Sequence, residues 1–153
     1  MKKLLIVAHA PSVNTRRMAE AVLQGTRHPD IDGVTCRWVE PLNATPDDLL
    51  NCDAIILGTT ENLGYMSGAL KDFFDRCYYP CLEQKQGLPC ALYVRAGHDG
   101  TGTCKAVETI CTGLRWNWTQ PPLVCRGEWQ DQFLQECETL GATMAAGLEM
   151  GIY

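Results

Sequence analysis

Apolar and polar positions follow two periods along this chain, and the two periods predict strands and helices in turn. Short apolar runs with few polar interruptions indicate strands that are buried on both faces. Segments in which apolar residues recur every three or four positions indicate helices that bury one face. The predicted strands are 4–8, 34–39, 53–58, 89–94 and 121–125. The predicted helices are 14–25, 46–51, 67–79, 104–114 and 131–150, and Pro80 is expected to end the third of them.

This alternation of strands and helices predicts the fold class. Parallel strands joined by helices need right-handed crossovers, and these cover both faces of the sheet with helices. We therefore expect a three-layer α/β protein with a doubly wound, five-stranded parallel sheet. The length of 153 residues suits a single domain, spanning 1–153.

Charge and cysteine content exclude several classes of function. The net charge is -5 and the basic residues form no cluster, so a nucleic-acid partner is not expected. No segment is long enough to cross a membrane, and the apolar N-terminal run is expected to be a strand rather than a signal peptide. The nine cysteines contain no CxxC pair, and Cys77 and Cys81 lack accompanying histidines, so no metal site is predicted. Reduced cysteines and a cytoplasmic location are expected.

Three polar or glycine-rich segments follow predicted strands, at residues 9–15, 58–66 and 95–103. In such sheets ligands bind beyond the carboxyl ends of the strands, where the strand order reverses, so we expect these segments to converge. In the first one, Ser12, Asn14 and Thr15 stand where a helix begins and its first N–H groups lack partners. A phosphate group could accept from them. The alternative is an ordinary helix N-cap at Ser12 or Asn14.

The absence of two motifs limits the class of ligand that the first loop could bind. The first loop has neither GxGxxG nor GxxxxGK[ST], which argues against a dinucleotide-binding fold and a P-loop NTPase and favours a mononucleotide. Glycines in the other two segments allow the backbone to approach a flat ligand closely. They are Gly58, Gly64, Gly68, Gly97, Gly100 and Gly102. A flavin ring has a polar edge that such backbone could bind.

Two stretches carry a family resemblance: Ser12-Val-Asn-Thr15 and Gly64-Tyr-Met-Ser-Gly-Ala-Leu-Lys-Asp-Phe-Phe-Asp-Arg76. Through them the chain resembles the flavodoxin-like superfamily, in particular its small FMN-dependent NAD(P)H oxidoreductases, over nearly its whole length. The resemblance implies strand order 2-1-3-4-5, FMN as cofactor and NAD(P)H as electron donor. Val13 stands where the family usually has glycine, and Ala10 where a hydroxyl residue is common.

The resemblance also implies roles for individual residues. Ser12, Asn14 and Thr15, with the amide of Val13, would bind the FMN phosphate. Along the isoalloxazine ring would lie Thr60, Glu61, Asn62, Gly64, Tyr65 and Met66. Gly97, His98 and Gly102 would cover the pyrimidine side of the ring.

The remaining candidates are histidines and one tyrosine near the strand ends. His9 and His98 could donate to the ligand or move a proton, or be polar loop residues without a catalytic role. Tyr65 could stack on the ring or on a nicotinamide, or only anchor the start of the following helix. His98 and Tyr65 are the sole catalytic candidates among the side chains, since the flavin would carry the chemistry.

The expected function is an FMN-dependent oxidoreductase that passes hydride from NAD(P)H to a quinone-like or other small acceptor. Two alternatives remain open: a flavodoxin-type electron carrier that docks on a redox protein partner, and a flavin-free interaction module. No membrane partner is expected, and a homodimer is plausible because aromatic residues near the flavin could pack across a two-fold axis.

Overall fold

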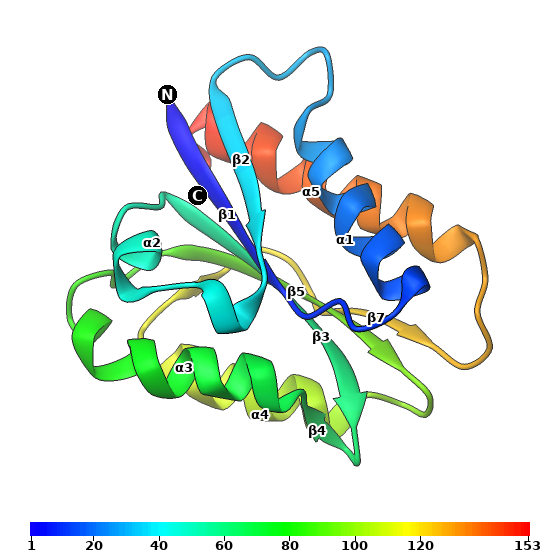
Figure 1. The fold of residues 1–153 in the computed structure, drawn as a ribbon. Coiled ribbons are helices and arrows are strands. Elements are labelled where there is room, and N and C mark those ends of the chain that lie inside the picture. Colours follow the sequence, from blue (N-terminus) through cyan, green and yellow to red (C-terminus); the bar gives the residue numbers. More distant parts are fainter.

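A twisted parallel sheet separates two layers of helices (Figure 1). The computed structural model describes residues 1–153. The main strands are β1 (Lys2–Ala8), β2 (Val34–Val39), β3 (Ala54–Asn62), β5 (Pro89–Ala96) and β7 (Leu123–Arg126). They pair in parallel in the spatial order β2-β1-β3-β5-β7. The predicted fold class and strand order are therefore confirmed.

The fifth position of the sheet is shared by two short strands. β6 (Asn117–Trp118) pairs with the first two residues of β5, and β7 pairs with the last four. Pro121 and Pro122 lie between them, and proline has no N–H to donate to a neighbouring strand. The predicted strand 121–125 therefore begins at Leu123 and lacks its first piece.

The two helical layers bury opposite faces of the sheet. On one face lie α1 (Val13–Thr26) and α5 (Gln132–Met150); on the other lie α2 (Pro46–Leu50), α3 (Gly68–Cys81), α4 (Thr101–Gly113) and the 3-10 turn η1 (Pro41–Asn43) (Figure 1). Along β1, Leu4, Ile6 and Ala8 face the α1 layer, and Leu5 and Val7 face the α3 layer. Since successive side chains of a strand point to opposite faces, an unbroken apolar run serves both cores.

Two predicted boundaries are wrong. Helix α3 continues through Pro80 to Cys81, because a proline in the last turn costs one amide hydrogen bond while Cys77 and Cys81 are buried against the sheet. Residues 58–66 are not a loop. Instead β3 extends to Asn62, where Thr59 and Thr60 still pair with β5, and the chain returns as the short antiparallel strand β4 (Tyr65–Met66).

All nine cysteines are free thiols, and seven of them are buried. No three of the histidine, cysteine, aspartate and glutamate side chains lie close enough together to hold a metal ion. None of the helices combines the length and the apolar composition that crossing a bilayer requires.

Candidate functional site

The three segments meet at the carboxyl edge of the sheet. Helix α1 follows β1 on one face, whereas α3 follows β3 on the other, so the strand order reverses between β1 and β3 (Figure 1). The diverging connections leave a crevice at such a point, and ligands of open α/β sheets bind there. The site predicted from the sequence lies at this position.

The first segment combines a helix cap with free donors. Ser12 is the N-cap of α1: its Oγ accepts from the Thr15 amide (3.1 Å), and the Thr15 Oγ1 accepts from the Ser12 amide (2.9 Å). The amides of Val13 and Asn14 have no acceptor within the chain, and the first turn contains no acidic residue. The cap that the sequence offered as an alternative is thus present at Ser12, and it leaves two amides available to an anion.

Val13 and Asn14 use their side chains differently. Val13 has a negative φ within α1 and a 75% exposed side chain, so its backbone has no need of the glycine that the family usually has here. Asn14 is half-buried, and its Oδ1 accepts from the Arg17 guanidinium (3.1 Å). The free donors of this segment are therefore the two amides and the Asn14 carboxamide N–H group, whereas the Ser12 and Thr15 hydroxyls bond to each other (2.8 Å).

The second and third segments are joined to each other. The His98 amide donates to Oε1 of Glu61 (3.3 Å), which ties the turn after β5 to the end of β3. At the hairpin tip Leu63 and Gly64 both have positive φ (53° and 77°), the geometry of a type I′ turn. A Cβ on Gly102 would collide with the Gly64 carbonyl, so Gly102 allows α4 to approach the hairpin. Its place against a ring stays a prediction.

The hairpin and the third loop still present an open surface. A Cβ on Gly64 or Gly97 would meet nothing within 4 Å, and His98 and Tyr65 are exposed. At the end of β3, Thr60 Oγ1 donates a hydrogen bond to Asn62 Oδ1 (2.9 Å). These positions lie at the carboxyl ends of β3 and β5, which are neighbouring strands.

Two predicted residues lie elsewhere. The Met66 side chain is buried in the core with α3 and α4, because neighbouring strand residues point to opposite sides and Tyr65 takes the outer one, so only the Met66 backbone can meet a ligand. The imidazole of His9 lies 4.0 Å from the carboxylate of Glu40, beside β2 and on the side of β1 away from the hairpin. His9 is thus not brought together with His98.

Tyr93 on β5 was not anticipated from the sequence. It lies in register with Gly58 and Ala8, and a Cβ on Gly58 would collide with its ring. Its hydroxyl is buried on the face of the sheet that α1 and α5 cover, and it has no hydrogen-bond partner in the protein. Burial raises the pKa of Tyr93 well above its usual value. An unpartnered buried hydroxyl needs a water or a ligand to bond. A tyrosine opposite a glycine in a strand of small and aliphatic residues was the available signal.

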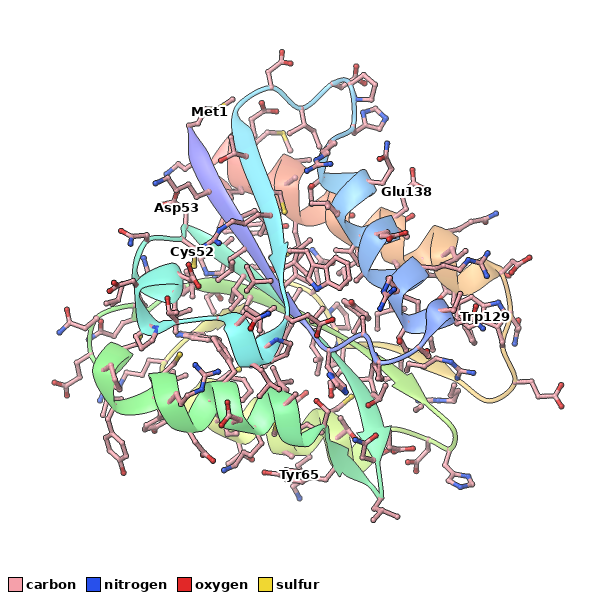
Figure 2. The ribbon with its side chains drawn as sticks, viewed as in Figure 1. Met1, Cys52, Asp53, Tyr65, Trp129 and Glu138 are labelled. Carbon is pink, nitrogen blue, oxygen red and sulfur yellow. The ribbon has the colours of Figure 1, made fainter.

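A second group lies beside α1. Trp129, in the segment between β7 and α5, lies beside the first turn of α1, whereas Tyr65 lies at the hairpin on the side of α3 and α4 (Figure 2). Two guanidinium groups lie near the Trp129 ring, those of Arg17 (5.6 Å) and Arg95 (5.8 Å). The segment that contains Trp129 therefore lies on the α1 side of the site, and the hairpin that contains Tyr65 lies on the other side.

The donor set fits a phosphate ester that carries a flat ring. Free amides at a helix N-terminus without carboxylates suit a phosphate monoester. The buried Tyr93 hydroxyl, which has no partner, lies in the core on the same face of the sheet as α1. The open surface at Gly64 and Gly97 admits a planar group to the backbone.

Two curated proteins are similar to this chain in sequence. No family model matches the chain. A flavodoxin from Aquifex aeolicus is 30% identical over 114 residues, which cover 74% of this chain and 60% of the relative. An NAD(P)H dehydrogenase (quinone) from Acidithiobacillus ferrooxidans is 33% identical over 94 residues, covering 50% of this chain and 47% of the relative. The chain thus matches about half the length of these curated relatives.

Solved structures match over nearly the full chain. A flavodoxin from the domain Archaea superposes with a TM-score of 0.81 at 23% identity and covers 95% of this chain and 98% of that one. A flavodoxin, WrbA-like protein from Agrobacterium tumefaciens superposes with a TM-score of 0.76 at 22% identity and covers 95% and 96%. Identities this low establish the fold alone.

Proposed function

We propose that this flavodoxin-like protein binds FMN, with the phosphate at the start of α1. One observation carries the proposal: at the point where the strand order reverses, the Val13 and Asn14 amides have no acceptor and the first turn of α1 has no carboxylate. A phosphate monoester complements these donors, with the Ser12 and Thr15 hydroxyls beside them. The flavodoxin relative supports FMN in preference to other phosphate esters.

The isoalloxazine ring lies, in this proposal, against the hairpin and the third loop. The Glu61–His98 hydrogen bond holds the two walls together, and Gly64 and Gly97 keep the backbone accessible. Tyr65 is 42% exposed and contacts the ring or an incoming nicotinamide. When bound, FMN supplies the hydride and electron chemistry, so the protein needs no nucleophile.

The activity that we propose is NAD(P)H-dependent reduction of a quinone-like or other small acceptor. The relative named as an NAD(P)H dehydrogenase (quinone) supports this activity. Electron transfer to a redox protein is the second candidate, and the similarity to a flavodoxin over 74% of the chain favours it. Both candidates need the same FMN site.

Reconstitution tests these proposals in order. The purified protein is titrated with FMN while flavin fluorescence and the visible spectrum are recorded, and we expect a yellow, stoichiometric complex. The complex is then mixed with NADH or NADPH and a soluble quinone, and we expect oxidation of the nicotinamide. FMN binding without this oxidation would favour the electron carrier. No binding at saturating FMN, and no gain in thermal stability, would overturn the flavin site and favour an interaction module.

A further inference from the structure

A series of contacts runs from the start of α5 to the first loop and ends at Asn14. Arg17 Nη1 donates to Asn14 Oδ1 (3.1 Å), and Arg17 Nη2 lies 3.8 Å from Asp131 Oδ1. Trp129 Nε1 donates to the same carboxylate oxygen of Asp131 (3.1 Å). The Arg17 guanidinium also lies 5.6 Å from the centroid of the Trp129 ring, which Figure 2 shows beside the first turn of α1. Three contacts therefore hold one guanidinium group.

Trp129 is itself held from the sheet and from α5. Its ring meets that of Phe133 edge to face, with centroids 5.5 Å apart and planes at 85°. The Arg95 guanidinium lies 5.8 Å from the Trp129 centroid and 5.1 Å from the Phe133 centroid. Arg95 Nη1 donates to the carbonyls of Ala96 and Cys125, at 3.0 and 3.1 Å. The group that positions Arg17 is thus fixed to β5, β7 and α5.

Donor chemistry then decides which way the Asn14 carboxamide faces. A guanidinium group has only donors, so Asn14 must turn its oxygen toward Arg17. The Nδ2 group of Asn14 then points away from Arg17 and has no acceptor in the chain. Asp131 lies near Arg17 and is mostly exposed, so the contact helps to position the guanidinium group.

We propose that Arg17 is a positioning residue that orients the Asn14 carboxamide to donate its N–H to the phosphate of FMN, without touching the phosphate itself. The inference rests on the proposed function and specifies which side chain reads the phosphate. Arginine is suited to this task because its planar fork can donate to Asn14 while it lies near the Asp131 carboxylate and over the Trp129 ring, which a lysine ammonium group cannot do.

The test compares FMN with riboflavin, which lacks the phosphate, in fluorescence titrations of the full chain. We expect Arg17→Met to weaken FMN binding about tenfold and riboflavin binding less than about twofold. Arg17→Lys should weaken FMN binding almost as much, although it keeps the charge. In an Asn14→Ala background, Arg17→Met should have no further effect. Arg16→Met is the matched control, since Arg16 is exposed on the same turn and makes no side-chain bond.

Other outcomes would overturn the inference. Full rescue by Arg17→Lys, or an equal loss from Arg16→Met, would show that charge alone acts on the phosphate. Equal losses from Arg17→Met with and without Asn14 would show that the two residues act separately. A parallel loss of riboflavin binding would indicate a structural role. Failure of the unsubstituted protein to bind FMN while the apoprotein is folded would instead overturn the proposed function itself, and this inference with it.

Discussion

The N-termini of α1 and α2 carry the same cap but leave opposite electrostatic surroundings. Ser12 and Thr15 form the capping box of α1, and Thr45 and Asp48 form that of α2. In α1 the residues after the cap leave amides free, and no carboxylate is present. In α2 the first residue is Pro46, which has no N–H, and two aspartates follow. The N-terminus of α1 is open to an external anion, whereas the N-terminus of α2 already carries carboxylates of its own.

The carboxylates of α2 are also used by a neighbouring strand. Asp48 accepts from the Thr45 amide (2.9 Å) and is ion-paired with Arg37 of β2. Burial by itself raises the pKa of Asp48, but the hydrogen bonds from Thr45 and Arg37 outweigh it, so the pKa lies below its usual value. The comparison teaches that a capping box determines where a helix begins, whereas the next two residues determine whether an external anion can bind there.

Giving α1 the charge of α2 should have the largest effect. Asn14→Asp keeps the shape of the side chain and puts a carboxylate beside the proposed phosphate. At about 5 Å and an effective dielectric constant of about 20 the repulsion is about 3 kcal/mol, or about 100-fold in Kd. FMN titration measures the change, and urea unfolding of the apoprotein is the control, where we expect no loss. Unchanged FMN affinity would show that no phosphate binds at this helix.

Removing the two caps separates stability from binding. Ser12→Ala and Thr45→Ala should each lower the free energy of unfolding of the apoprotein by about 1 kcal/mol, since each removes one hydrogen bond to a third-position amide. Only Ser12→Ala should also weaken FMN binding, by about tenfold. Urea unfolding and FMN titration of both variants check this. An equal loss of FMN affinity in Thr45→Ala would contradict the assignment.

The pH dependence of the free energy of unfolding should show the contribution of Asp48 at the N-terminus of α2. Because the pKa of Asp48 is lowered in the folded protein, its contribution is complete above the unfolded pKa of about 3.9 and is lost as the pH falls through the folded value. Asp48→Asn should therefore lower the free energy of unfolding by about 0.7 kcal/mol at pH 7. The difference from the unsubstituted protein should hold down to about pH 5 and shrink toward pH 2. If the difference in free energy of unfolding grew as the pH fell, the pKa of Asp48 would be raised in the folded protein rather than lowered.

The smallest effect is expected where the sequence departs from the family. Val13→Gly restores the usual glycine, yet Val13 already has helical backbone and an exposed side chain. We expect FMN affinity to change less than about twofold, and the free energy of unfolding to fall by about 0.3 kcal/mol because glycine is a poorer helix former than valine. The same two titrations measure this. A large gain in FMN affinity would mean that the valine side chain obstructs the phosphate.

Much of the fold followed from the order of the residues. Continuous apolar runs such as 4–8 and 89–94 predicted strands buried on both faces, and the structure confirms them. The extension of β3 was missed because Thr59 and Thr60 are polar, and only their pairing with Val94 and Arg95 makes them strand residues. Likewise the continuation of α3 past a proline depends on core contacts that no local pattern records.

The candidate site divides in the same way. The cap at Ser12 and the absence of acidic residues in the next turn are local properties, so the sequence was sufficient to predict them. The contact of Arg17 with Trp129 and Asp131 joins distant parts of the chain, and no local sequence pattern predicts it. Nor did it find that His9 faces Glu40 or that Met66 is buried.

The sequence by itself determined the strands, the helices, the layer arrangement and the helix terminus at which an anion can bind. These follow from periodicity and from groups a few residues apart, whose interactions do not depend on the rest of the fold. The tertiary structure alone decided that Arg17 lies against Trp129 and Asp131, and that Glu61 and His98 join the hairpin to the third loop. Those depend on what distant segments bring to the same edge of the sheet, because a donor's partner is set by proximity in space.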